Sequence, residues 1–215
     1  MSAPDERSTY YNEIAGSSRE RLGALSDGIF GVAMTLLVLT LAVPTAEEVK
    51  AAGDLGGALI HLVPNVVTYV MSFLTLGIFW VGQQTQLSQL ERSDRDYTWI
   101  MLAFLLFVTF VPFSTMLLAA FYQSRLALVE YWFNVAILGA AILAGAEYAA
   151  HSHFFPAARQ ATILRAIRMR IYSAQGLYLV ASAFCIIDTR ISIGLIVLLQ
   201  LNYAIAPRLA FLRRL

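Results

Sequence analysis

Long runs of apolar residues alternate with short polar segments along this chain. A helix needs about 20 mostly apolar residues to cross the hydrocarbon core of a bilayer. Because lipid offers no partners to exposed backbone groups, each such run is expected to be a helix. We therefore predict an all-α integral membrane protein, a single domain over residues 1–215 in which about 1–20 form a cytoplasmic N-terminal segment. The six predicted transmembrane helices cover residues 22–43, 58–81, 97–120, 126–149, 171–187 and 191–211.

Two prolines fall inside the predicted spans. Pro64 lies in the second span and Pro112 in the third. A proline inside a helix removes one backbone hydrogen bond and clashes with the preceding turn. We expect both helices to be kinked at these positions.

The longest connection, residues 151–170, has an amphipathic pattern. Arg165 and Arg168 recur at helical spacing beside Ile163, Leu164 and Ile167. Such a pattern is typical of a short helix that lies on the membrane surface.

Charge is sparse and unevenly distributed. Only 13% of the residues are charged, whereas soluble domains carry about a quarter. The net charge of +1 includes no clustered basic face, so nucleic acid is not an expected partner. Lys50, Arg125 and Arg190 fall on one side of the predicted spans and the other 12 of the 15 basic residues on the opposite side. The positive-inside rule then places both termini in the cytoplasm, for a multi-pass protein of the cell membrane.

Motifs for catalysis, cofactors or resident metals are not found, so an enzyme is not predicted and no cofactor is expected. His151 and His153 fall in a connection and are interpreted as solvated side chains. Glu130 and Glu147 lie near the two ends of the fourth span and are weak candidates for an ion path. Three tryptophans fit interfacial belts: Trp80, Trp99 and Trp132.

The start of the first span carries an acid that is costly in lipid. Ser26 and Asp27 lie about one turn inside this span. Asp27 comes six residues after Arg21. An intramembrane acid is by default an anchor with a partner, although a simple contact at the helix start is the alternative. Gly28 and Gly31 follow, and such small residues let another helix approach closely.

One side of the first span is continuously apolar. Thr35 lies near this stripe and Thr40 lies away from it. Periodicity alone is typical of a surface that faces lipid or packs against protein. The stripe consists of Leu25, Ile29, Val32, Leu36, Leu39 and Val43.

The motif RLGALSD, residues 21–27, resembles the RxxxFSD signature of the transmembrane protein 175 family of potassium channels. The segment that follows this motif, GIFGVAMTLLVLTL, is similar to the segment that follows the signature in that family. FLLFVTFVPFSTMLL in the third span resembles the family's LLPFxT element. The chain departs from the family at Leu25, where an aromatic residue is usual, and at Gln83 and Gln84, where paired histidines are frequent.

The resemblance implies a homotetramer in which the first helix of each six-helix unit lines a central pore. Potassium ions would pass an apolar constriction, with modest selectivity over sodium. The matching positions for the pore lining and gate are Val32, Thr35, Leu36 and Leu39. Arg21, Ser26 and Asp27 would hold helices together by buried polar contacts. No metal beyond permeating potassium is implied.

Two other functions remain open from the sequence. A secondary transporter would show repeated halves and charged sites near the membrane midplane, and neither pattern is seen. Nothing in the spans argues against an accessory or structural membrane protein. Passive ion flux distinguishes a channel from both.

Overall fold

The computed structural model describes residues 18–205, and every regular element in that range is helical. The elements are α2 (Arg19–Leu36), the 3₁₀ helix η1 (Leu37–Thr40), α3 (Ala46–Ala52), α4 (Leu55–His61), α5 (Val63–Ser88), α6 (Arg95–Ala120), α7 (Arg125–His151), α8 (Gln160–Ala183), the 3₁₀ helix η2 (Phe184–Ile186) and α9 (Thr189–Ile205).

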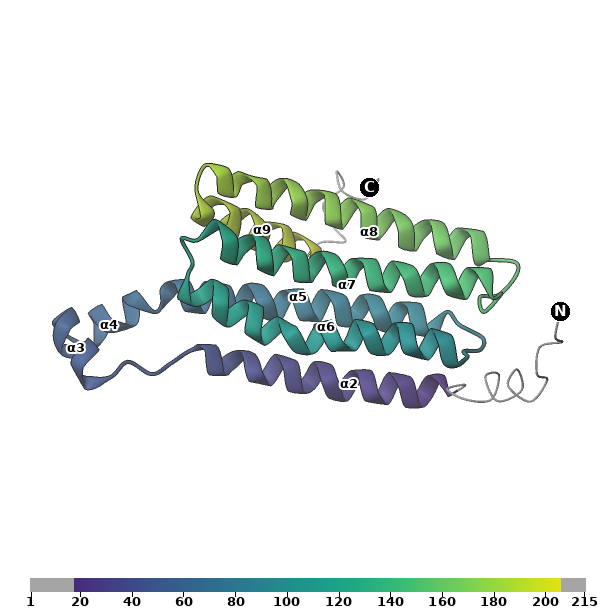
Figure 1. Cartoon of the computed structure of the whole chain (residues 1–215), viewed down its shortest axis with the longest axis horizontal. Coiled ribbons are helices and arrows are strands. Elements are labelled where there is room, and N and C mark those ends of the chain that lie inside the picture. Colours follow the sequence, from purple (N-terminus) through teal and green to yellow (C-terminus); the bar gives the residue numbers. More distant parts are fainter. Residues whose placement is uncertain (1–17, 206–215) are drawn as a thin grey trace, which may run out of the picture.

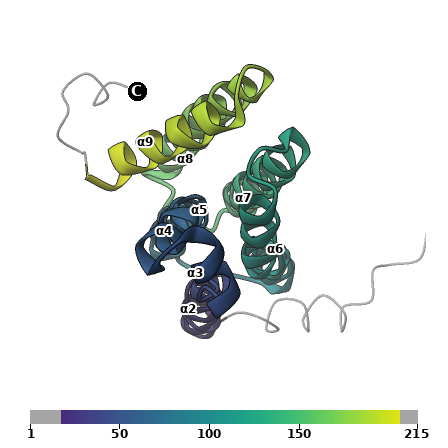
Figure 2. The same ribbon diagram turned by 90° about the vertical axis from the view of Figure 1, so that its left-hand side faces the viewer.

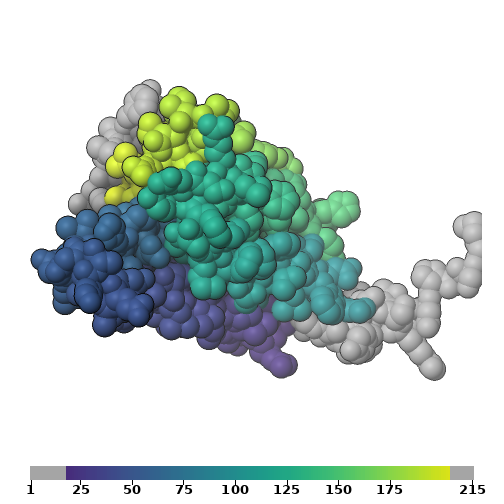
Figure 3. Space-filling view, turned by 60° about the vertical axis from the view of Figure 1, so that its left-hand side comes forward, coloured from purple at the N-terminus to yellow at the C-terminus, as the bar shows by residue number. Residues whose placement is uncertain are grey.

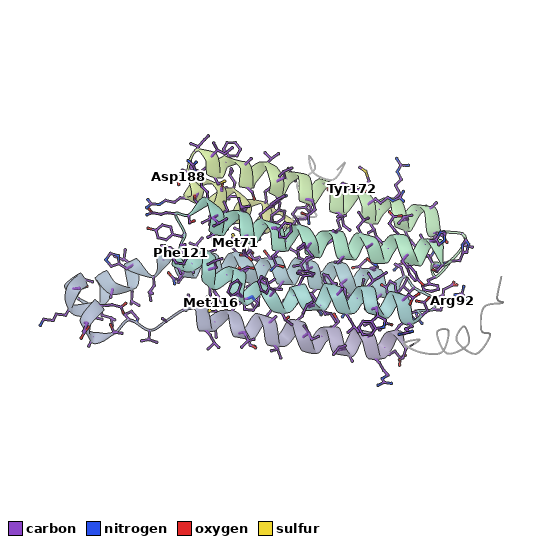
Figure 4. All side chains as sticks on the ribbon, viewed as in Figure 1. Met71, Arg92, Met116, Phe121, Tyr172 and Asp188 are labelled. Atoms are coloured by element: carbon purple, nitrogen blue, oxygen red, sulfur yellow. The ribbon has the colours of Figure 1, made fainter. Side chains whose placement is uncertain are left out.

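Six long helices lie side by side in one elongated bundle (Figure 1). Viewed along the bundle, α2 lies at one edge and α8 and α9 at the opposite edge (Figure 2). Helix α5 is the most central element, because it contacts α2, α6, α7 and α9. Arg92 and Asp188 mark the two ends of the bundle in Figure 4, and α3 and α4 extend beyond the end where Asp188 lies.

Four helical segments within residues 18–205 are long and apolar enough to cross a membrane. These are Arg19–Thr40, Val63–Ser88, Arg95–Ala120 and Arg125–His151, which correspond to the first four predicted spans. The fifth predicted span is the C-terminal part of α8 together with η2, and the sixth coincides with α9, a shorter apolar helix in the described range. Residues 206–211 of that sixth span, and 1–17 of the N-terminal segment, lie outside the described residues.

The second predicted span begins differently from the expectation. The chain between α2 and α5 forms two short helices, and the helix that crosses the bundle starts at Val63. Pro64 occupies the first turn of α5, where a missing N–H costs nothing because first-turn donors have no partner inside the helix. The predicted kink at Pro64 is therefore wrong, whereas Pro112 does lie inside a helix, α6.

The predicted separate surface helix is also wrong. Arg165 and Arg168 belong to α8, which runs without a break from Gln160 to Ala183. This stretch contains no proline. In addition, Arg168 pairs with Glu147 of α7, with 2.6 Å between its Nη2 and Oε2, so the basic end of α8 is held along α7.

The interior consists of apolar side chains from neighbouring helices. In the middle of the bundle, Phe30 and Leu37 pack with Leu76 of α5 and with Phe104 of α6. Phe30 and Phe104 are also an aromatic pair, with ring centroids 5.9 Å apart. The inner side of α2 is therefore fixed to α5 and α6 by well-packed contacts.

Candidate functional site

Helix α2 has one side buried against the bundle. It starts after Ser18, whose Oγ accepts a hydrogen bond from the backbone N–H of Arg21. Its buried residues recur every three or four positions, so they share one face, which packs on α5 and α6. They are Leu22, Ser26, Phe30 and Ala33, followed by Leu37 at the start of η1.

The other side of α2 is uncovered within a single chain. Val32 is 59% exposed, Leu36 43% and Leu39 70%, whereas Leu37 is fully buried. In Figure 3, α2 forms the lower edge of the molecule. A groove of about 390 Å³ follows this side and includes Leu25, Gly28, Val32 and Leu36. The predicted pore-lining residues thus lie together on one open, apolar surface, which we call the outer face of α2.

Thr35 also lies on the exposed side of α2. Its Oγ1 donates to the backbone oxygen of Val32 at 2.8 Å, which is the local bond that threonine commonly makes inside a helix. The hydroxyl oxygen can still accept a further bond or coordinate a cation. Thr40, which was predicted only to lie away from the apolar stripe, faces inward and donates to the backbone oxygen of Leu37 at 2.8 Å.

Ser26 and Asp27 bind α2 to α5. The fully buried Ser26 donates from Oγ to Oε1 of Gln83 at 2.9 Å. Asp27 Oδ1 accepts two hydrogen bonds, from Nε1 of Trp80 at 2.8 Å and from Nε2 of Gln84 at 2.5 Å. Both residues therefore face polar groups of the neighbouring helix, but only Ser26 is buried, whereas Asp27 is exposed in the single chain.

Arg21 does not take part in this group within the chain. Its side chain is exposed, and its backbone N–H donates to the Oγ of Ser18. Arg19 instead connects the start of α2 to the end of α5, because its guanidinium donates to the backbone oxygen of Leu90. An assembly role for Arg21 remains a prediction.

Sequence reasoning missed the three partners on α5. Trp80 was interpreted as part of an interfacial belt, and Gln83 and Gln84 as departures from a family pattern. Their spacing of three and four positions puts them on one side of α5, and this shared side was the available signal. Both glutamines make hydrogen bonds to α2: Gln83 accepts from Ser26 and Gln84 donates to Asp27.

In the described range, no three His, Cys, Asp or Glu side chains come together in a way that could hold a metal ion. The site consists of an apolar outer face and a polar anchor on the opposite side of the same helix. This arrangement can line a passage or an interface between chains.

The chain is similar to known channels over most of its length. Residues 21–112 match the family described as "Endosomal/lysosomal potassium channel TMEM175". A potassium channel of Chamaesiphon minutus is 32% identical over 195 residues, which are 88% of this chain and 95% of the relative.

Two further similarities extend this comparison. The crystal structure of a lysosomal potassium-selective channel TMEM175 homolog from Chamaesiphon minutus superposes with a TM-score of 0.75 at 31% identity, covering 86% of this chain and 96% of that one. The endosomal/lysosomal proton channel TMEM175 of Homo sapiens is 26% identical over 201 residues, which are 86% of this chain but 39% of the human protein.

Proposed function

Because this chain belongs to the TMEM175 family, we propose that it is a potassium channel of the cell membrane in which the outer face of α2 lines the pore. Four copies would surround one axis, each contributing α2 with η1. The relatives that are named potassium channels support the ion, and the exposed position of Val32, Leu36 and Leu39 supports the pore lining.

The observation that carries this proposal is the contrast between the two sides of α2. A lone helix at the edge of a bundle would need only lipid on its outer side. Here that side combines Leu25, Val32 and Leu36 with Gly28 in a groove, which lets neighbouring helices approach while bulky apolar groups still project. Four such faces around an axis would form a narrow apolar neck.

A narrow apolar neck controls the passage of ions by admitting or excluding the water that hydrates them. Its walls offer water too few hydrogen-bond partners, so the neck empties when narrow and fills when it widens slightly. Potassium loses its hydration shell more easily than sodium, so potassium passes a barely wetted neck more readily. Selectivity from this mechanism is modest, and the Thr35 oxygen is the polar group placed to replace lost water.

Ser26 and Asp27 give the pore helix a fixed attachment. Their bonds to Gln83, Trp80 and Gln84 lie at the end of α2 away from Leu36 and Leu39. With the distribution of basic residues, this end is the cytoplasmic one. The anchor then holds the cytoplasmic end while the narrow part lies toward the outer half of the membrane.

Flux through purified protein in liposomes tests the proposal. Vesicles loaded with potassium should lose it passively through the protein and should lose sodium several-fold more slowly under a matched gradient. A pH-sensitive dye in the same vesicles reports whether protons pass, the activity named for the human relative. Flux that requires a second, coupled substrate would identify a transporter. Potassium efflux no faster than from protein-free vesicles would contradict the channel proposal.

A further inference from the structure

Helices α6 and α7 share a buried polar group that the proposed pore does not use. Ser114 of α6 donates from Oγ to Oε1 of Glu130 at 2.9 Å and accepts from Nδ2 of Asn134 at 3.1 Å. Ser114 is fully buried and Asn134 is 3% exposed. Glu130 is half-buried and lies within the segment of α7 that can cross the membrane.

Two oxygen atoms of this group have no hydrogen-bond partner. They are Oε2 of Glu130 and Oδ1 of Asn134, and both are buried. Residues four apart on a helix lie on the same side, with about 5–6 Å between their Cβ atoms, so the two side chains are neighbours. Buried polar atoms are nearly always paired, and two unpaired acceptors on neighbouring side chains indicate that a positive or hydrogen-bond-donating group belongs with them.

The charged and titratable neighbours do not supply that group. Arg125, on the same helix, donates to the backbone oxygen of Ile186 at 2.9 Å. The Tyr131 hydroxyl already interacts with Ser72 and Thr75 of α5, and Tyr131 lies about 100° around α7 from Glu130. Glu147 and Arg168 form an ion pair at the opposite end of α7, away from Glu130. The unpartnered donor nearest in sequence, Nε1 of Trp132, is two positions along from Glu130 and so about 200° around the helix.

A metal cation, a water molecule or a proton could bind between Glu130 and Asn134. They differ in which ligand positions or charges would remain unsatisfied. A metal cation needs about six oxygen ligands, whereas this group offers the two unpaired oxygens and the Ser114 hydroxyl. A water molecule could donate to both oxygens, but the carboxylate charge would remain unpaired inside the membrane, which is costly. One proton on Glu130 removes the charge and lets Oε2 donate to Asn134, so it satisfies both atoms at once.

We propose that Glu130 is a proton-binding site. Its Oε2 carries a proton and donates a hydrogen bond to Oδ1 of Asn134, while the Ser114 hydroxyl donates a hydrogen bond to Oε1. Glu130 is only five residues from the start of α7, about 7.5 Å along the helix, so protons from the nearby aqueous surface can reach it. Loss of the proton would put a charge between α6 and α7 and weaken their contact. The site is independent of the α2 pore.

Infrared spectroscopy of the protein in lipid at neutral pH tests this site. We expect the carbonyl band of a protonated carboxyl, with the intensity of one group per chain. Glu130→Gln should remove the band. The matched control is Glu147→Gln on the same helix, which should keep it because Glu147 is ion-paired with Arg168.

Ser114→Ala gives a second measurement that does not depend on the folding of the Glu130 variant. The band should persist but shift to higher frequency, because Oε1 loses its donor. Absence of the band in the unaltered protein would overturn the site. So would a band that is unchanged in both Glu130→Gln and Ser114→Ala.

Discussion

At the scale of single residues, α2 carries two hydroxyl groups with opposite surroundings. Ser26 is buried and bonded to another helix, whereas Thr35 is exposed and bonded to its own helix. The two lie nine positions apart, about 180° around the helix. This separation places the Ser26 and Thr35 hydroxyls on opposite sides of one helix.

Ser26→Ala should therefore destabilise the fold. The change leaves Oε1 of Gln83 without its donor, and Nε2 of Gln83 already lacks a hydrogen-bond partner. A buried unsatisfied group of this kind costs about 1–3 kcal/mol. Thermal unfolding in detergent measures the loss. Thr35→Ala is the control and should change stability by less than about 0.5 kcal/mol; equal effects would mean that Ser26 is no anchor.

Asparagine substitutions on α2 should separate its two faces. Leu36→Asn or Leu39→Asn would place four amides in the neck, so water would wet it. We expect higher basal current and weaker preference for potassium, measured as flux from liposomes. Leu37 is fully buried, so Leu37→Asn should lower stability without opening a leak. If only Leu37→Asn caused a leak, the pore lining would have been assigned to the wrong side of α2.

At the scale of elements, α6 and α7 are in extensive contact. A Cβ atom on Gly145 of α7 would lie 2.4 Å from Cε of Met101 on α6 and 3.1 Å from Nε2 of Gln86 on α5. The ends of two buried side chains therefore fill the space above Gly145, and a methyl group there would force Met101 to shift within the packed core. By contrast, Gly176 of α8 has open space where its Cβ would be.

Gly145→Ala and Gly176→Ala should consequently have opposite effects. The first overpacks the α6–α7 contact, at a cost of about 1–3 kcal/mol. The second should be neutral or stabilising by up to about 1 kcal/mol, since alanine favours a helix more than glycine does. Unfolding temperatures of both variants decide this, and a stabilised Gly145→Ala would contradict the packing described above.

At the scale of the whole molecule, the proposed pore exists only between chains. One chain offers a single α2 with an open outer face, so the proposal requires assembly. Native mass measurement in mild detergent should give four copies. A monomer that still passes potassium in liposomes would refute the shared pore.

Cross-linking can place the axis of that assembly. Cys185 is the one cysteine of the sequence and is buried, so introduced thiols can be addressed selectively. Leu39→Cys should form linked chains with a short bifunctional thiol reagent. Leu179→Cys on α8, also exposed, should not. Linking at Leu179 alone would move the axis to the other edge of the bundle.

The sequence predicts the helical membrane fold because hydrophobic runs of sufficient length have few alternatives in lipid. It also predicts that Leu36 and Leu37 lie on different sides of α2, since helical periodicity alone decides that. It does not predict Gln83 and Gln84 as partners of Ser26 and Asp27, because pairing between distant helices depends on how they pack. Pro64 was misjudged because a proline has the same local sequence signature in a first turn as in a kink.

The change from α2 to η1 has a geometric consequence for the two leucine positions. In an α-helix, three residues turn about 300°, whereas in a 3₁₀ helix they turn about 360°. The tighter winding after Leu36 therefore brings Leu39 nearly into line with it, at a rise of about 6 Å instead of about 4.5 Å. Rewinding η1 as α-helix would swing Leu39 sideways by roughly 60°. We therefore expect that a change of winding in this short stretch of backbone would turn the Leu39 side chain relative to Leu36 while α2 keeps its place.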